Sequence, residues 1–118
     1  MIKWACYSQH ITGFLHWGFN FWSSESIYGI NPAARFKGDG FIVYPDPAHH
    51  GVLMSNRGLS TVIGLEEWEL LSQLGAKNSA AAAALARRVA RTFRDFSDDP
   101  AVLETARAEL FALLDGCI

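Results

Sequence analysis

Residues 13–22 constrain the fold more than any other part of the chain, because this short apolar run holds five aromatic rings. The run predicts a buried strand: it is too short for an independent helix, and Gly13, Gly18 and the aromatic residues favour a strand. His16 and Asn20 stand where an ordinary core strand would carry Val or Ile. A buried imidazole or amide without hydrogen-bond partners costs roughly 1–3 kcal/mol, so both side chains need partners.

Two interpretations of this run remain open. In the first, a ligand rich in hydroxyl groups supplies the partners of His16 and Asn20, and Trp17 or Trp22 provides a flat apolar platform. An indole face beside an amide is a common way to hold a sugar ring. In the second, all five aromatic residues belong to the core, and His16 is a core histidine with internal partners.

Length and composition exclude several classes of protein. With 118 residues, 50% of them hydrophobic, the chain can form one domain with a real core. A net charge of −2 argues against a nucleic-acid partner, because such proteins usually gather basic residues on one face. No apolar run approaches the roughly 18 residues that a membrane span needs. Cys6 and Cys117 lack the spacing of a disulfide framework or a zinc site.

The order of elements in the first part of the chain is typical of an α/β unit. Residues 1–10 predict a short helix, residues 14–22 the aromatic strand, and residues 41–44 a second strand. Residues 23–39 have no clear periodicity, and their length and apolar content indicate an ordered binding loop that ends at Asp39. The first helix has no capping residue before it, so we expect the chain to be part of something longer.

After a second loop through residues 49–51, the C-terminal half predicts three helices. They cover residues 58–74, residues 79–96, and a stretch that begins at Asp99, an N-cap followed by proline. Glu66 falls within the apolar arc of the first helix, so we expect a cation or a backbone donor beside it. That arc comprises Leu59, Val62, Ile63, Leu70, Leu71 and Leu74. The second helix has four arginines on a side expected to be solvated, opposite a stripe of Leu85, Val89, Phe93 and Phe96.

Self-contained catalytic chemistry is hard to find in the sequence. Cys6 and His10 stand one helical turn apart, but no oxyanion-hole element or orienting carboxylate accompanies them. The side chains of His49 and His50 would diverge in extended structure, so we expect no metal and no cofactor. A glycosidase pair would need two carboxylates ~5–10 Å apart, which spacing alone does not establish. Three carboxylates lie in loops near the aromatic run: Glu25, Asp39 and Asp46.

Several segments, taken in order, resemble a known family. They are residues 12–22, Ile30-Asn-Pro32, Gly38-Asp-Gly-Phe-Ile-Val-Tyr-Pro45, Ser55-Asn-Arg57 and Gly64-Leu-Glu-Glu-Trp-Glu-Leu-Leu71. This series resembles the C-terminal part of the glycoside hydrolase family 123 catalytic domain, and residues 98–107 look like that family's closing helix.

The resemblance implies the C-terminal portion of a (β/α)8 barrel, in which a late strand and its loops are closed by three C-terminal helices. Residues 1–45 would hold the last barrel elements and the binding loop, and residues 46–118 the helices, in a single partial domain of residues 1–118. Active sites of such barrels lie at the C-terminal ends of the strands. The residues implied at the sugar pocket are Trp17, Asn20, His16, Trp22 and Asp39.

The resemblance also implies a hydrolase of N-acetyl-β-galactosaminides that uses the substrate's own acetamido group as nucleophile, oriented by adjacent Asp and Glu residues. This chain has no such pair on a barrel strand, so the pair would lie upstream, and the isolated chain is expected to be inactive. The expected partners are a carbohydrate substrate and the N-terminal barrel portion of the parent protein. The alternatives are a carbohydrate- or protein-binding domain without catalysis and a purely structural helical module.

Overall fold

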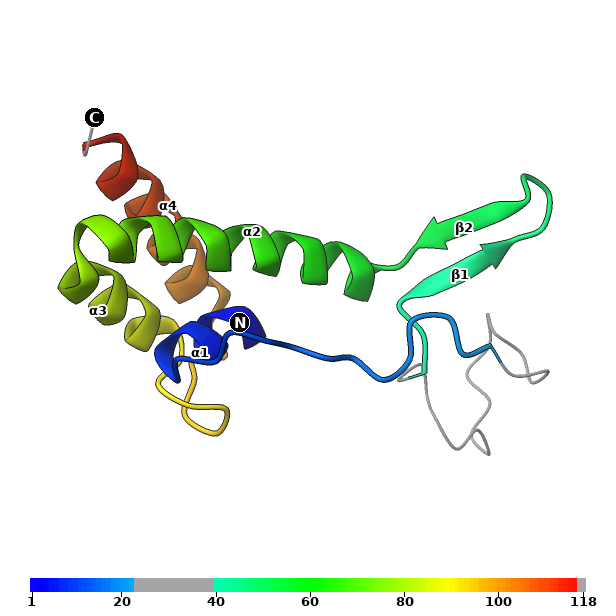
Figure 1. Ribbon diagram of the computed structural model, residues 1–118, viewed down its shortest axis with the longest axis horizontal. Coiled ribbons are helices and arrows are strands. Elements are labelled where there is room, and N and C mark those ends of the chain that lie inside the picture. Colours follow the sequence, from blue (N-terminus) through cyan, green and yellow to red (C-terminus); the bar gives the residue numbers. More distant parts are fainter. Residues whose placement is uncertain (23–39, 117–118) are drawn as a thin grey trace. The chain divides into compact units, whose positions relative to one another are not determined.

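The computed structural model of the protein describes residues 1–22 and 40–116. Within them the elements are α1 (Ile2–Ser8), β1 (Val43–Asp46), β2 (Gly51–Met54), α2 (Asn56–Lys77), α3 (Ser79–Val89) and α4 (Pro100–Asp115) (Figure 1). This mixture of helices and a small sheet agrees with the expected α/β class. The chain divides into two compact units: unit 1 is Met1–Phe14 with Ile63–Ile118, and unit 2 is Leu15–Val62. The expected binding loop with Asp39 lies outside the described residues, as does Cys117.

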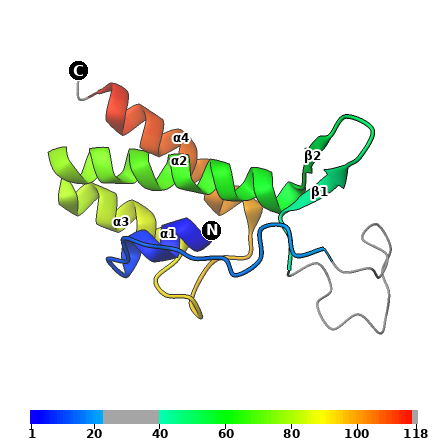
Figure 2. The ribbon, with the colours of Figure 1, turned by 45° about the vertical axis from the view of Figure 1, so that its right-hand side comes forward.

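Unit 1 is a helical assembly with one apolar core. α1 and α4 each pack against α3, and the two views in Figures 1 and 2 show α1 beside α3. α3 contributes two alanines, a leucine and a valine to this core, and the small alanines let its backbone approach the neighbouring helices closely. The buried core residues are Trp4, Ala5, Leu71, Leu74, Ala82, Leu85, Ala86, Val89, Ala90, Ala106 and Leu110.

The starts of the last two helices follow from their capping residues. The side chain of Asn78 accepts the backbone N–H of Ala81 across 3.0 Å at the start of α3. The Asp99 carboxylate accepts the N–H of Ala101 across 2.9 Å, with Pro100 at the first position of α4. Both caps satisfy backbone donors that a helix leaves unpaired, so the predicted starts at residues 79 and 99–100 are confirmed.

The end predicted for the second helix is wrong, because α3 stops at Val89 rather than near residue 96. Ala90 adopts an extended conformation and bridges to Phe96, which closes a compact loop. The Thr92 hydroxyl accepts the N–H groups of Arg94 and Asp95 and so stabilises this loop. Phe93 and Phe96 consequently lie off the helix, each about half exposed.

The buried face of α2 also differs from the prediction. The helix is longer than predicted and continues through Gly75, but Leu59, Val62 and Ile63 are about half exposed instead of buried. Glu66 is exposed, whereas its neighbour Glu67 is buried. The face that packs is Gly64, Glu67, Leu71 and Leu74.

Two glycines explain why this face of α2 packs. A Cβ on Gly64 would lie 2.9 Å from Cγ of Lys3, and a Cβ on Gly75 would overlap the Tyr7 hydroxyl. Gly64 costs helix stability by itself, roughly 1 kcal/mol relative to alanine, and its role here is to let Lys3 pack against α2. The absence of side chains at these positions lets α1 lie against α2.

The end of α1 separates Cys6 from His10. The N–H of Ile11 donates to Cys6 O across 2.8 Å, and the N–H of His10 donates to Tyr7 O across 3.0 Å. These two bonds form a Schellman cap, in which His10 takes the left-handed position with φ 56°. Cys6 is buried and His10 is exposed, so the two side chains do not form the catalytic pair considered from their spacing.

Unit 2 is built around an antiparallel hairpin of β1 and β2, with Val43 opposite Met54 and Asp46 opposite Gly51. β1 begins two residues later than predicted, and β2 occupies residues expected to be a loop. β2 was not predicted because its short sequence does not alternate between apolar and polar residues. Such alternation marks a strand with one buried face, and all four residues of β2 are exposed.

The aromatic run is not the regular strand that we predicted. Residues 14–22 contain a single isolated bridge, between Asn20 and Phe41. The run bends because the N–H of Gly18 donates to the His16 side chain and the N–H of Trp22 donates to Asn20 O, two residues back in each case. Such local bonds compete with a regular ladder.

Candidate functional site

The aromatic run is attached to residues 40–43, here called the anchoring segment. The N–H of Phe21 donates to Gly40 O and the N–H of Ile42 donates to Phe19 O, each across 2.9 Å. Between these bonds lies the bridge from Asn20 to Phe41. The anchoring segment therefore determines where the aromatic side chains of the run point.

Two glycines bring these backbones unusually close. A Cβ on Gly18 would lie 2.7 Å from Cα of Gly40, closer than real Cβ contacts occur. A Cβ on Gly40 would lie 3.2 Å from Cη2 of Trp17 and 3.4 Å from Cδ1 of Phe21. The bare backbone of Gly40 is thus the surface on which both rings rest.

Trp17 and Phe21 form a pair of rings that we call the aromatic corner. Their centroids are 5.6 Å apart and their planes are inclined by 55°. Trp17 is 50% exposed and Phe21 is 58% exposed. Tilted aromatic pairs at this separation stabilise each other, so the rings are held in place although half of their surface meets solvent.

His16 and Trp22 satisfy their polar groups within the run and the anchoring segment. His16 accepts the N–H of Gly18 at Nδ1 across 3.2 Å, which leaves the proton of a neutral ring on Nε2. The Trp22 indole donates to Val43 O across 2.9 Å. Trp22 is therefore fixed by its polar end, and its ring is partly buried rather than an open platform.

The structure thus distributes the predicted site residues along the anchoring segment. Trp17 lies at Gly40, Asn20 lies opposite Phe41 and is exposed, and Trp22 is bonded to Val43. Asp39 lies outside the described residues. Phe21, which sequence reasoning placed in the apolar run without a role in the site, completes the aromatic corner.

Sequence reasoning also missed how the start of α2 holds the anchoring segment. The Ser55 hydroxyl donates to Ile42 O across 2.6 Å and accepts the N–H of Gly58 across 3.1 Å, so it caps α2 as well. Arg57 donates to Phe41 O from Nη2 across 2.9 Å and from Nε across 3.2 Å. A serine directly before a helical run was the available signal for the cap, and no sequence pattern pointed to the carbonyl of Phe41.

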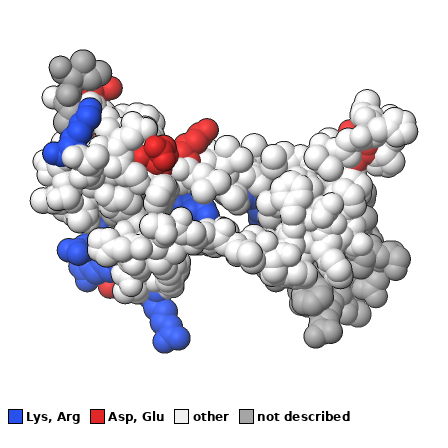
Figure 3. Space-filling view, in the orientation of Figure 1, with Lys and Arg blue, Asp and Glu red and all other residues white. Residues whose placement is uncertain are grey.

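Charged side chains are sparse among the residues of this unit that the structure describes. In the described part of unit 2, Asp46 and Arg57 are the charged residues, and the face seen in Figure 3 is nearly all white there. Asp46 is 2.8 Å from Nδ1 of His49, at the turn of the hairpin. A neutral surface with half-exposed rings can bind an uncharged ligand, but residues 15–22 and 40–62 hold no pair of carboxylates for acid–base chemistry.

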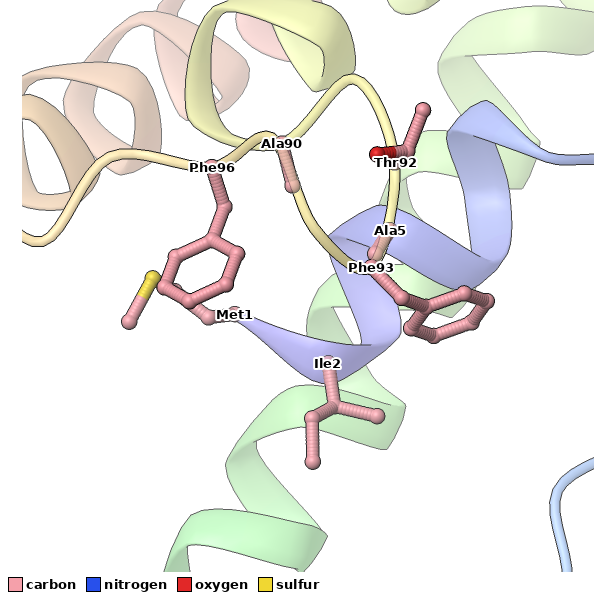
Figure 4. Close-up of a pocket in the computed structure, with 7 residues that line it drawn as sticks. All are labelled: Met1, Ile2, Ala5, Ala90, Thr92, Phe93 and Phe96. Atoms are coloured by element: carbon pink, nitrogen blue, oxygen red, sulfur yellow. The ribbon is translucent and has the colours of Figure 1, made fainter.

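Unit 1 has a small apolar pocket of about 120 Å³. Figure 4 shows the rings of Phe93 and Phe96 on the side of their loop that faces the first turn of α1. The remaining lining residues are Met1, Ile2, Ala5, Ala90 and Thr92. Apart from the hydroxyl of Thr92, these side chains offer no group for chemistry.

The part of the chain that the structure describes has neither a metal site nor a membrane span. No three His, Cys, Asp or Glu side chains there come together as they would around a metal ion. None of the helices in residues 1–22 and 40–116 combines the length and the apolar character of a membrane span.

The chain matches a known protein family. Residues 1–74 match the model of a family described as "Glycoside hydrolase 123, catalytic domain". The matched part contains all of unit 2, α1 and most of α2, and it ends before α3. No curated protein matches the chain.

Proposed function

Since the chain belongs to the glycoside hydrolase 123 catalytic-domain family, we propose that it is the C-terminal part of a barrel that hydrolyses N-acetylhexosaminides such as N-acetyl-β-galactosaminides. In this proposal the chain supplies sugar-binding residues, and the Asp–Glu pair that orients the acetamido group belongs to the upstream part of the parent protein. The observation that carries the proposal is the aromatic corner, two half-exposed rings held against Gly40, in a part of unit 2 whose described residues carry little charge.

The roles of the side chains follow from their geometry. Trp17 and Phe21 would receive the apolar C–H face of a sugar ring, because burying that face against aromatic carbon removes apolar surface from water. Asn20 can both donate to and accept from hydroxyl groups, and His16 retains the Nε2 proton for a hydroxyl oxygen. Asp39 would accept from a hydroxyl. Trp22 would support the site through its bond to Val43.

A titration of the purified chain with N-acetylgalactosamine tests the binding part of this proposal. We expect a millimolar Kd and chemical-shift changes of residues 16–22 in two-dimensional NMR spectra. Trp17→Ala should weaken the affinity about tenfold, which corresponds to ~1.4 kcal/mol of binding free energy. Phe93→Ala is a matched control, because Phe93 is an equally exposed ring in unit 1. Equal losses in both variants, or no binding by the wild-type chain, would overturn the proposal.

The catalytic part of the proposal predicts that the isolated chain does not hydrolyse an aryl N-acetyl-β-galactosaminide. In the described residues of unit 2 the one carboxylate is Asp46, which pairs with His49 at the hairpin turn, and the proposed Asp–Glu pair lies upstream. Turnover above the uncatalysed rate at stoichiometric protein would refute this. In the intact parent, Trp17→Ala should lower kcat/KM by roughly 10- to 100-fold.

Sugar binding without any catalysis is the second candidate, favoured by the scarcity of charge among the described residues of unit 2. The reading frame upstream of Met1 separates the two candidates. A barrel portion with adjacent Asp and Glu supports the hydrolase, whereas its absence supports a free-standing carbohydrate- or protein-binding domain.

A further inference from the structure

The anchoring segment has two edges with different partners. On one edge, the N–H of Ile42 donates to Phe19 O, and Phe41 bridges Asn20. On the other edge, the carbonyl groups of Phe41 and Ile42 accept hydrogen bonds from side chains at the start of α2. Any displacement of the anchoring segment toward or away from α2 would therefore displace Asn20 and the aromatic corner too.

Arg57 holds Phe41 in two ways. Its two N–H groups converge on the carbonyl oxygen at 2.9 and 3.2 Å, and its guanidinium carbon lies 5.3 Å from the centroid of the Phe41 ring. A planar guanidinium that donates twice to one oxygen leaves that oxygen little freedom, and a cation near a ring restrains the ring as well. Arg57 thus fixes both the backbone and the side chain of the residue opposite Asn20.

Ser55 and Gly58 also contact the anchoring segment, but both are part of the start of α2 as well. Ser55 bonds Ile42 O and caps the helix with the same hydroxyl. A Cβ on Gly58 would lie 2.9 Å from Ile42 O, so the first turn of α2 is pressed against the segment. Substitutions at these two positions would disturb the helix, whereas the contacts of Arg57 go to Phe41 and leave the cap intact.

We propose that Arg57 is a positioning residue for the aromatic corner: by fixing Phe41 it sets the place of Asn20, Trp17 and Phe21 without contacting the sugar. The inference rests on the proposed sugar-binding function, which it extends to a residue outside the aromatic run. It predicts that Arg57 controls affinity more than it controls folding.

The test compares Arg57→Met, which keeps the aliphatic stem but loses every donor, with Arg57→Lys, which keeps the charge and regains a donor. Arg87→Met removes an exposed arginine from α3 and serves as the control. For each variant we would measure the Kd for N-acetylgalactosamine, the melting temperature, and the amide exchange rates of Phe21 and Ile42. We expect Arg57→Met to weaken binding about tenfold and speed exchange at both amides, with partial recovery in Arg57→Lys and no change in Arg87→Met.

Three outcomes are decisive. Wild-type affinity and exchange in Arg57→Met would overturn the proposal. A lowered melting temperature with unchanged affinity in the folded fraction would also overturn it, because Arg57 would then be merely structural. If the wild-type chain binds no sugar, the proposed function fails on its own, and the exchange rates alone decide: faster exchange that lysine reverses supports positioning by Arg57, and unchanged exchange refutes it.

Discussion

The indole N–H of Trp4 donates to Oε2 of Glu67 across 2.6 Å, inside the core of unit 1. Arg107 donates from Nε to the other oxygen of this carboxylate. Burial alone would lower the pKa of Arg107, but the hydrogen bond and the negative charge of Glu67 outweigh burial and raise that pKa. One carboxylate therefore joins α1, α2 and α4, and its charge is compensated where water has little access.

Glu67→Gln should lower the free energy of unfolding by about 2–3 kcal/mol. Removing one charge of a buried pair usually costs ~3–5 kcal/mol, and the partly exposed Arg107 recovers some of this through solvation. Glu66→Gln is the matched control, because Glu66 is the exposed neighbour, and it should change stability by less than about 0.5 kcal/mol. Urea denaturation measures both, and equal effects would contradict the role assigned to Glu67.

Gly75→Ala should destabilise the chain by about 1–3 kcal/mol, because the new methyl group would overlap the Tyr7 hydroxyl. The same substitution in a Tyr7→Phe background should be neutral or stabilising by up to about 1 kcal/mol, since alanine is the better helix former and the hydroxyl is gone. Denaturation of the four proteins of this double-mutant cycle gives the coupling free energy between positions 7 and 75. Additive effects would mean that the two positions do not touch.

Stability at alkaline pH should depend on Tyr7. Burial raises the pKa of Tyr7 above its usual value near 10, so the folded protein retains a proton that the unfolded chain releases. Above about pH 10 the unfolded state binds fewer protons, and the free energy of unfolding falls as the pH rises through the pKa of the folded state.

Lys3 acts in the opposite direction over the same range. Burial lowers the pKa of Lys3, so its contribution to stability increases as the pH approaches the usual lysine value of about 10.5. Because Lys3 is present in both the wild type and Tyr7→Phe, its contribution cancels when the unfolding free energies of the two proteins are subtracted. We expect the free energy of unfolding of Tyr7→Phe to fall less steeply than that of the wild type between about pH 9.5 and 11, a range that spans roughly one pH unit around the usual tyrosine pKa. Parallel pH profiles would show that Tyr7 is not responsible.

His10→Gly should stabilise the chain by about 0.5–1 kcal/mol, because the left-handed conformation at this Schellman position suits glycine better than any residue with a Cβ. His10→Ala loses the imidazole but keeps the Cβ, and it should not stabilise. Thermal melts of the two variants distinguish the backbone effect from any effect of the side chain. A stabilised alanine variant would assign the gain to loss of the imidazole instead.

The helix starts could be predicted from sequence because local chemistry determines them. Asn78 and Asp99 each pair with a donor two or three residues ahead, so no distant part of the chain is needed. The buried face of α2 could be predicted only in part: Leu71 and Leu74 of the expected arc are buried, whereas the arc's first three residues are half exposed. Apolar residues occupy several sides of this helix, so the elements packed against it decide which side is buried. The choice of Glu67 over Glu66 depends on Trp4 and Arg107, which are distant in sequence.

The candidate site was predictable in its residue types more than in its geometry. The aromatic run indicated where rings and polar groups gather, but the bends at Gly18 and Trp22 replaced the expected strand. The aromatic corner exists because Gly18 and Gly40, far apart in sequence, meet backbone to backbone. The need of His16 for a polar partner was expected correctly, although a backbone N–H group meets it in this structure. Asn20, expected to need a partner in the same way, is exposed, and Trp22, expected as a platform, bonds to Val43 O through its indole N–H.

Unit 1 is assembled from Met1–Phe14 and Ile63–Ile118, with the whole of unit 2 between them in the chain. A ribosome that adds about 5–20 residues per second would therefore synthesise Trp4 several seconds before Glu67, which accepts its N–H group. By the time Glu67 is added, the aromatic run and the anchoring segment have both been made, whereas α3 and α4, the other helices of unit 1, do not yet exist. The order of synthesis thus favours folding of unit 2 before unit 1 can be completed.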